Sequence, residues 1–286
     1  MNEHHIQTVD YHAADAGQAF THSIADSGFA LLQNHPLAAD RLKRIYADWL
    51  AFFASDEKFD YAQSDRDPNG DQHGYFSLAV SEKAVGHDVK DIKEFFHAGP
   101  DGRMPDALRG DIMAYRACAL TLARELLGWL DTYIPTDVRN NTTLDLGASL
   151  ADAESLLRIL HYPPLSGDEP AGSVRAAAHE DINFITLLPV ADAPGLQVLS
   201  KSGDWLDLDG REGDLIVNTG DMLRELTNGY VKSTTHRVIN PTDAAANRSR
   251  ISIPFFLTPA LDSRLSSRYT AGEYLAERIE AIDGSR

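Results

Sequence analysis

The feature that most restricts the fold of this chain is a change of pattern near its middle. Before Pro135, apolar residues mostly recur every three to four positions, as they do in amphipathic helices. After Pro135 they fall in short runs rich in β-branched and aromatic residues, separated by turn-forming Gly, Pro, Asn and Asp. Several short strands with regular turns indicate an antiparallel sandwich or barrel. We therefore predict an α+β protein with a mainly β core, a jelly roll, against which the N-terminal helices pack.

The same change of pattern sets the expected division of the chain. A length of 286 residues can bury one large core, and we predict a single domain over residues 1–286. Residues 1–150 should form a mainly helical N-terminal region, with one buried strand at residues 28–33. Residues 151–262 should form the jelly-roll core with the metal site, and residues 263–286 should end the chain in a helix.

A candidate metal site lies where a polar run enters one of the predicted strands. His179 and Asp181 are two positions apart there, and side chains at that spacing point to the same face of a strand. They would supply half of a metal site, and His236, in a later β-rich run, is the candidate for the remaining ligand. Two His and one carboxylate on one side of a metal leave its other side open, which suits non-haem Fe(II) and O₂. For the first pair alone, the alternative is a surface His beside a solvated Asp.

A candidate carboxylate receptor follows further along the chain. Arg250 and Ser252 are again two positions apart on a predicted strand, so the guanidinium and the hydroxyl should share a face. A guanidinium fork can bind a carboxylate through two parallel hydrogen bonds. Each of these short motifs occurs by chance in many chains. A His-x-Asp pair, a distant His and an Arg-x-Ser pair in this order, however, have few explanations that are only structural.

Three other residues are weaker candidates, for contact with a substrate. Asn183 lies in register with the predicted metal strand and could line the pocket beside it. His73 and Tyr75 follow a loop rich in Asp, Asn, Gly and Pro, and such irregular segments often form the rim of a pocket. For His73 and Tyr75, a surface or turn position is the alternative.

Charge and cysteine content disfavour several kinds of partner and location. The chain has 26 Lys and Arg against 43 Asp and Glu, a net charge of −17, which disfavours nucleic acid and anionic membranes as partners. Its one cysteine, Cys118, excludes an internal disulfide and fits a reducing cytoplasm. No apolar run is long enough to span a bilayer, and the first residues carry no secretion signal. We expect a cytoplasmic protein that acts on a small molecule, without a prediction of its oligomeric state.

Together these runs resemble the isopenicillin N synthase-like family of Fe(II)- and 2-oxoglutarate-dependent oxygenases. The resemblance covers nearly the whole chain and is specific for the family, although not for one member or substrate. The runs that carry it are Gly28-Phe29, Asn34-His35, His179-x-Asp181 with Ile185-Thr186-Leu187-Leu188, Gly195-Leu196-Gln197-Val198, Asn218-Thr219-Gly220-Asp221-Met222, Thr227-Asn228-Gly229, Lys232-Ser233-Thr234, His236-Arg237-Val238 and Arg250-x-Ser252.

The resemblance implies a double-stranded β-helix fold and a role for each candidate residue. It identifies the two His and the Asp of the candidate metal site as ligands of Fe(II). It implies that Arg250 and Ser252 hold the distal carboxylate of 2-oxoglutarate and that Tyr162 helps to hold it. The family usually has an Asn two positions before that tyrosine, and this chain has Leu160 there, so one polar contact to the cosubstrate is in doubt.

The implied activity is that of a 2-oxoglutarate-dependent non-haem iron dioxygenase. Such an enzyme uses O₂ to oxidise a small molecule by hydroxylation, desaturation or cyclisation, and it releases succinate and CO₂. Two alternatives stay open from the sequence. One is an Fe(II) oxidase of the same fold that does not use 2-oxoglutarate, and the other is a binding or hydrolytic protein that holds Zn²⁺ in the same three side chains.

Overall fold

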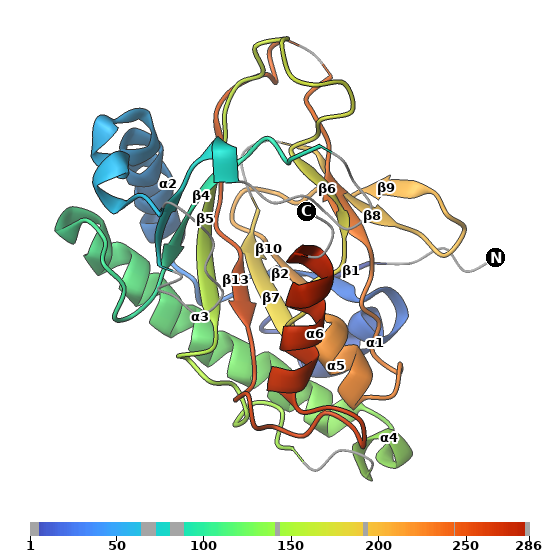
Figure 1. Cartoon of the computed structure of the whole chain (residues 1–286). Helices are drawn as coiled ribbons and strands as arrows, with labels where there is room; N and C mark the ends of the chain where they lie inside the picture. The colour runs from blue at the N-terminus through green and yellow to red at the C-terminus, as the bar shows by residue number, and fades with distance from the viewer. Residues whose placement is uncertain are drawn as a thin grey trace.

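The strands of the protein form two sheets that are packed together, with helices on the outside of the larger one (Figure 1). The computed structural model describes residues 6–63, 73–80, 89–140, 144–190, 194–242 and 244–283. The predicted mainly β core with packed helices is confirmed, and the described strands form two sheets rather than one closed barrel.

The larger sheet is antiparallel except at one edge, where β1 runs parallel to β2. Its strands, in spatial order, are β1 (Gln7–Asp10), β2 (Phe29–Gln33), β10 (Leu215–Thr219), β7 (Ile185–Pro189), β13 (Phe255–Leu257), β5 (Leu156–Tyr162), β4 (Glu94–Ala98) and β3 (Gly74–Phe76), with β12 (Arg250–Ser252) also paired with β5. β12 and β13 meet β5 one after the other, because Pro254 between them has no N–H to continue the ladder.

The smaller sheet has four short antiparallel strands. In spatial order they are β6 (Ala176–His179), β11 (His236–Val238), β8 (Leu196–Leu199) and β9 (Trp205–Asp207). Buried residues of this sheet pack with residues of β2 and β10 in one hydrophobic cluster, so its inner face lies against the larger sheet. The space between the two sheets is where a site can be enclosed.

Helices cover the other face of the larger sheet. They are α1 (Ala16–Ser27), α2 (Ala39–Ala54), α3 (Asp106–Tyr133), α4 (Thr136–Asn140), α5 (Asp221–Leu226), α6 (Ala271–Asp283) and the 3-10 helix η1 (Asp56–Tyr61). The short 3-10 helix η2 (Leu78–Val80) instead packs through Val80 against the cluster of Leu160 and Tyr162 on the inner face. The long α3 runs along the sheet and contacts β7 and β13, while α2 contacts β5 and β12 (Figure 1). Among the described helices, none is both long enough and apolar enough to cross a membrane.

The strand β5 shows how alternation separates the two faces of the larger sheet. Leu157 and Ile159 are fully buried in the main hydrophobic core with the helices. Leu160 and Tyr162 belong to a separate cluster on the other face of the same strand. Side chains at even positions of β5 therefore point away from the helices, towards the smaller sheet.

The N-terminal region contributes more strand than the sequence predicted. The expected strand at residues 28–33 is present as β2, and β1, β3 and β4 extend the sheet on both sides. β4 was obscured by the charged residues just before it and by Glu94, its first residue. This carboxylate is buried and accepts hydrogen bonds from Lys58 and Tyr75, so its charge is satisfied inside the protein.

Candidate metal centre

The two candidate imidazoles come from neighbouring strands of the smaller sheet. His179 ends β6, His236 begins β11, and the antiparallel register places them directly opposite each other. In each ring, Nδ1 is close to the backbone carbonyl two residues earlier, 2.7 Å from Ala177 O and 3.1 Å from Thr234 O. We assign the proton to Nδ1, which donates these bonds. Each Nε2 then keeps a free lone pair for a metal.

Asp181 completes the group. Its Oδ1 lies 3.9 Å from Nε2 of His179 and 3.9 Å from Nε2 of His236. One ligand atom of each residue lies within 4.8 Å of the others. Two atoms bound to one ion at about 2.1 Å are at most about 4.2 Å apart, so the 3.9 Å separations already fit and a small ring rotation closes any wider one. The three side chains therefore fit a metal ion with His, His and carboxylate ligands.

The prediction that one strand contains both His179 and Asp181 is wrong, because the strand is shorter than predicted. β6 ends at His179, and residues 180–184 cross from the smaller sheet to β7 of the larger one. The N–H of Asp221, the first residue of α5, donates to the carbonyl of Asp181 at 2.8 Å and holds this crossing in place. Asp181 is thus positioned by a short helix and a loop, not by the alternation of a strand.

Two side chains of the larger sheet orient the carboxylate of Asp181. Its Oδ2 accepts hydrogen bonds from Thr186 Oγ1 at 2.5 Å and from Asn218 Nδ2 at 2.7 Å, which leaves Oδ1 to face the imidazoles. Burial acts to raise the pKa of Asp181, but the imidazoles and these two hydrogen bonds outweigh it and hold the pKa below its ordinary value. The group is therefore an anionic ligand at neutral pH.

Asn183 supports this arrangement indirectly, because it contacts Thr186. The sequence placed it in register with the ligands and predicted that it lines the pocket. In the structure it lies in the crossing, and its Nδ2 donates to Thr186 Oγ1 at 2.9 Å and to Ile185 O at 3.1 Å. Gly220 lies against it so closely that a Cβ there would be 2.4 Å from Asn183 O, so no side chain fits at that position. The amide is directed at Thr186.

His236 is backed by the turn between α1 and β2. The ring of Phe29 meets the imidazole edge-on, with centroids 5.5 Å apart. Gly28 makes this approach possible, because its φ of 73° is left-handed and a Cβ would lie 2.7 Å from Lys232 O. Thr234 Oγ1 also donates to Ser27 O at 2.7 Å. Gly28-Phe29, one of the runs that carry the family resemblance, therefore packs directly behind a candidate metal ligand.

His179 has a different environment. Desolvation lowers its pKa to about 4, and the charge of His236 acts in the same direction against the opposing effect of Asp181. Its side chain nevertheless keeps 40% of its surface exposed, so one edge of the ring stays open although protein atoms surround the rest. A neutral imidazole with an open edge is suited to binding a metal that must also admit small molecules.

The candidate carboxylate receptor lies on the inner face of the larger sheet. The antiparallel pairing of β12 with β5 places Arg250 opposite Tyr162 and Ser252 opposite Leu160, and all four are buried. The guanidinium carbon of Arg250 is 5.7 Å from the ring centroid of Tyr162. Burial raises the pKa of the Tyr162 phenol against the pull of nearby cations, so the hydroxyl is a neutral donor at pH 7. The structure thus brings together the three residues that the resemblance assigns to the cosubstrate.

Sequence reasoning missed a buried ion pair beside these residues. Lys93 Nζ contacts Asp91 Oδ2 at 2.7 Å, and Asp91 Oδ1 accepts a hydrogen bond from the N–H of Ala177 at 3.0 Å. The charge of Lys93 acts to lower the pKa of both His179 and Tyr162, so the ammonium lies near the metal group and the receptor alike. No spacing or motif distinguishes this lysine in the sequence.

His73 does not join the site. It lies beside Gly99, where a Cβ would be 1.9 Å from its Nε2, at the end of β4 that carries Ala98. Arg250 lies near the opposite end, because Glu94 pairs with His161 and Arg250 with the next residue of β5. The imidazole therefore fills a gap in the turn after β4.

Tyr75 also lies outside the site. It is buried on β3, and its hydroxyl donates to the carboxylate of Glu94. Burial raises the pKa of this phenol, and the hydrogen bond to Glu94 adds to the effect. Lys58 and His161 bind the same carboxylate, at 3.1 and 2.7 Å. The tyrosine thus belongs to a buried polar network on the helix-covered side of the sheet.

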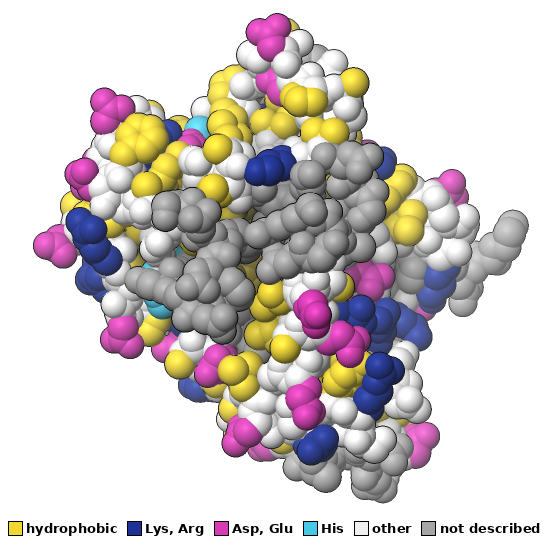
Figure 2. All heavy atoms as spheres, viewed as in Figure 1, with side chains coloured by type: hydrophobic (Ala, Val, Ile, Leu, Met, Phe, Trp, Pro, Cys, Tyr) yellow, Lys and Arg dark blue, Asp and Glu magenta, His cyan; other side chains and the backbone are white. Residues whose placement is uncertain are grey.

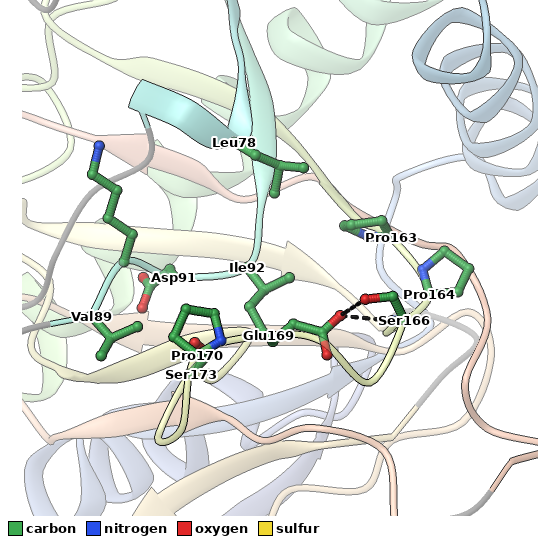
Figure 3. Close-up of a pocket in the computed structure, with 11 residues that line it drawn as sticks. Leu78, Val89, Asp91, Ile92, Pro163, Pro164, Ser166, Glu169, Pro170 and Ser173 are labelled. Carbon is green, nitrogen blue, oxygen red and sulfur yellow. Dashed lines mark hydrogen bonds between the residues drawn. The ribbon is translucent and has the colours of Figure 1, made fainter.

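A hollow of about 650 Å³ adjoins the site on its outer side, between the segment before β4 and the loop from β5 to β6. Figure 3 shows Leu78, Ile92 and prolines of this loop around it, and Glu169 bonded to Ser166. In Figure 2, hydrophobic side chains (yellow) are visible at the top of the molecule, where Figure 1 shows the loop from β5 to β6. The metal group does not line the hollow, but Asp91 does, and it accepts a hydrogen bond from the N–H of Ala177, two residues before His179.

Comparisons with known proteins identify the family. The model described as the 2OG-Fe(II) oxygenase superfamily matches residues 153–259, and that of the non-haem dioxygenase N-terminal region in morphine synthesis matches residues 6–114. A 2-oxoglutarate-Fe(II) type oxidoreductase of Emericella nidulans is 31% identical in an alignment 264 positions long that covers 81% of this chain and 70% of the relative. The chain belongs to the 2-oxoglutarate- and Fe(II)-dependent oxygenase superfamily.

Solved structures of the superfamily agree in fold. A Shewanella oneidensis protein classed as an oxygenase is 46% identical, with a TM-score of 0.86 and coverage of 97% of this chain and 98% of that one. A Neurospora crassa protein solved with α-ketoglutarate and thymine is 25% identical, with a TM-score of 0.77 and 96% of each chain covered. The resemblance inferred from the sequence and the double-stranded β-helix fold are confirmed.

Membership of the superfamily establishes the type of reaction. The protein is a 2-oxoglutarate-dependent dioxygenase that uses Fe(II), 2-oxoglutarate and O₂. The comparisons thereby favour 2-oxoglutarate use over the two alternatives that the sequence left open.

Proposed function

We propose that His179, Asp181 and His236 hold the iron of this dioxygenase. The observation that carries the proposal is the convergence of their ligand atoms within 4.8 Å, with each imidazole fixed through Nδ1. Two His and one carboxylate are the ligand set of Fe(II) sites that keep open positions for O₂. Fe(II) with 2-oxoglutarate and O₂ supplies the oxidising chemistry, with succinate and CO₂ as products. The protein side chains orient the ligands and exclude water around them.

We further propose that Arg250, Ser252 and Tyr162 bind the distal carboxylate of 2-oxoglutarate. The support is their shared position on the inner face of two paired strands. A buried guanidinium contributes about 1.5–3 kcal/mol per charge-assisted hydrogen bond to such an anion. Leu160 lies opposite Ser252 and offers no polar atom there, so the hydroxyls of Ser252 and Tyr162 take the remaining contacts.

For the substrate we propose a small organic molecule, oxidised by hydroxylation, desaturation or cyclisation. The support is the relative from Neurospora crassa that was solved with thymine, together with the acidic balance of the chain, which disfavours nucleic acid and membrane partners. We do not place His73, Tyr75 or Asn183 on the substrate, since each has another contact in the structure. A cytoplasmic location remains a proposal that rests on the single cysteine, and a single domain over the whole chain remains one that rests on length.

The proposal is tested with Asp181→Asn, which keeps the shape of the ligand and removes its charge. We expect this variant to lose Fe(II) affinity, the absorption band of the anaerobic Fe(II)–2-oxoglutarate complex, and succinate formation. Asp214→Asn is the matched control, because Asp214 is also buried and its hydrogen-bond partners, Gln33 and Arg211, lie outside the site. Normal iron binding by Asp181→Asn would rule out the assigned ligand set.

A further inference from the structure

Arg175 is a buried cation without an acidic partner in the part of the chain that the structure describes. Its side chain is about as buried as any in the protein, with 1% of its surface exposed. Nη2 donates to the carbonyl of Arg248 at 3.0 Å, and Nε has no acceptor among the described residues. Burial lowers the pKa of this guanidinium, and the positive charge of Arg250 lowers it further.

A second buried arginine shows what such a group normally requires. Arg116 on α3 is 3% exposed, and its Nη2 contacts Asp152 Oδ1 at 2.8 Å and the carbonyl of Ser155 at 2.9 Å. Buried charges are costly unless they are paired in this way. Arg175 has no such partner among the described residues, so we expect an anion from outside the described chain to balance its charge.

The position of Arg175 indicates which anion. It directly precedes β6, the strand that ends in His179, and its guanidinium carbon is 5.8 Å from the ring centroid of Tyr162. The guanidinium carbon of Arg250 is 5.7 Å from the same ring. Two like charges therefore border one tyrosine in a buried region. An anion bound there would relieve their repulsion and gain donors from both.

We propose that Arg175 is a second arginine of the pocket for the distal carboxylate of 2-oxoglutarate. This inference rests on the cosubstrate role proposed above for Arg250. A carboxylate has two oxygens with about four acceptor sites, enough for donors from both guanidinium groups and the hydroxyl of Tyr162. The pair of cations makes the site selective for a 2-oxo acid that carries a second carboxylate.

The test compares two ligands and two arginines. Arg175→Gln keeps a donor for the carbonyl of Arg248 but removes the charge, and Arg116→Gln is the matched control at a buried arginine on α3. Binding to the anaerobic Fe(II) protein is measured by calorimetry with 2-oxoglutarate and with 2-oxopentanoate, which has the same chain length without the distal carboxylate. We expect Arg175→Gln to raise the Kd of 2-oxoglutarate about 10- to 100-fold and to leave that of 2-oxopentanoate unchanged. Arg116→Gln should change neither.

Several results would overturn the inference. An unchanged Kd for 2-oxoglutarate in Arg175→Gln would do so, and so would an equal loss for both ligands, which would mean that Arg175 only shapes the protein. If Arg175→Gln does not fold, Arg175→Met decides by the same comparison, because it also removes the charge and keeps an unbranched side chain in the buried position. Arg250→Gln separates the two proposals, since normal 2-oxoglutarate binding in that variant would remove the role of Arg250 whatever the result at position 175.

Discussion

Replacing Thr186 by Val tests whether metal affinity depends on the orientation of Asp181. Val has nearly the shape of Thr, so the change removes the hydroxyl that donates to Asp181 Oδ2 at 2.5 Å and leaves Asn218 as the other donor. Asn183 loses one acceptor but keeps the carbonyl of Ile185. The carboxylate is then held at one point and can rotate away from the imidazoles.

The expected size of the effect follows from the type of bond. A hydrogen bond to a charged group contributes about 1.5–3 kcal/mol, and every 1.4 kcal/mol is roughly a tenfold change in an equilibrium constant. Loss of a partner that orients a metal ligand typically costs about 10- to 100-fold in metal affinity. The two estimates agree, so we expect Thr186→Val to weaken Fe(II) binding by about one to two orders of magnitude.

Anaerobic titration of the metal-free protein with Fe(II), or with Mn(II) as a stable substitute, measures this change directly. Thr21→Val is the control, because Thr21 is fully buried in α1 and its hydroxyl donates to the carbonyl of Gly17 at 2.8 Å. It should lower stability by about 1 kcal/mol and leave metal affinity unchanged. If Thr186→Val binds Fe(II) within twofold of the wild type, the orienting role of this hydrogen bond is refuted.

Three further predictions concern acidity and the two buried polar networks. The pKa of His179 in the folded protein is about 4, below its ordinary value of 6.5, so the contribution of this group to the stability of the metal-free protein should be complete above pH 6.5 and be lost as the pH falls towards 4. In denaturant unfolding at several pH values, the free energy of unfolding should therefore depend less on pH for His179→Gln than for the wild type, and an identical pH dependence would contradict the shift. Tyr75→Phe should lower the free energy of unfolding by about 1–3 kcal/mol through loss of its bond to Glu94, whereas a changed Kd for iron or 2-oxoglutarate would place Tyr75 at the site after all. Lys93→Met should cost about 3–5 kcal/mol by leaving Asp91 buried and unpaired, and Asp91→Asn in the same chain should restore part of the loss in thermal unfolding; no restoration would argue against a direct ion pair.

The candidate ligands could be predicted because their chemistry is visible in residue type and order. A His two positions from an Asp, a distant His in a β-rich run and an Arg two positions from a Ser have few other uses together. The reason given for the first pair was incomplete, however. His179 and Asp181 converge through the crossing that α5 holds, and the pattern of apolar residues does not show where β6 ends.

The supporting residues could not be predicted by the same means. Thr186 looks like an ordinary strand residue, and Asn218 comes to Asp181 only because β10 pairs with β7 in the folded sheet. Both fall within runs that carry the family resemblance, and that was the one signal available for them. Arg175 and Lys93 have no such signal, since only tertiary packing shows that they are buried together around Tyr162.

The irregular segment before β3 misled the prediction for a physical reason. Loops rich in Asp, Asn and Gly often border a binding site, but the residues that follow this loop enter an edge of the sheet. Tyr75 is buried there against Glu94, a charge that the linear pattern presents as solvent-facing. A charged residue that is neutralised by a distant partner resembles a surface residue until the fold is known.

The division of the site between two sheets has a consequence for substitutions far from it. The imidazoles belong to the four-stranded sheet, while the donors that orient Asp181 belong to the larger one, which is buttressed by α3. The positions of the three ligand side chains relative to one another therefore depend on the angle at which the two sheets pack. Repacking beneath α3, many residues away from any ligand, should register as altered iron retention before it registers as unfolding.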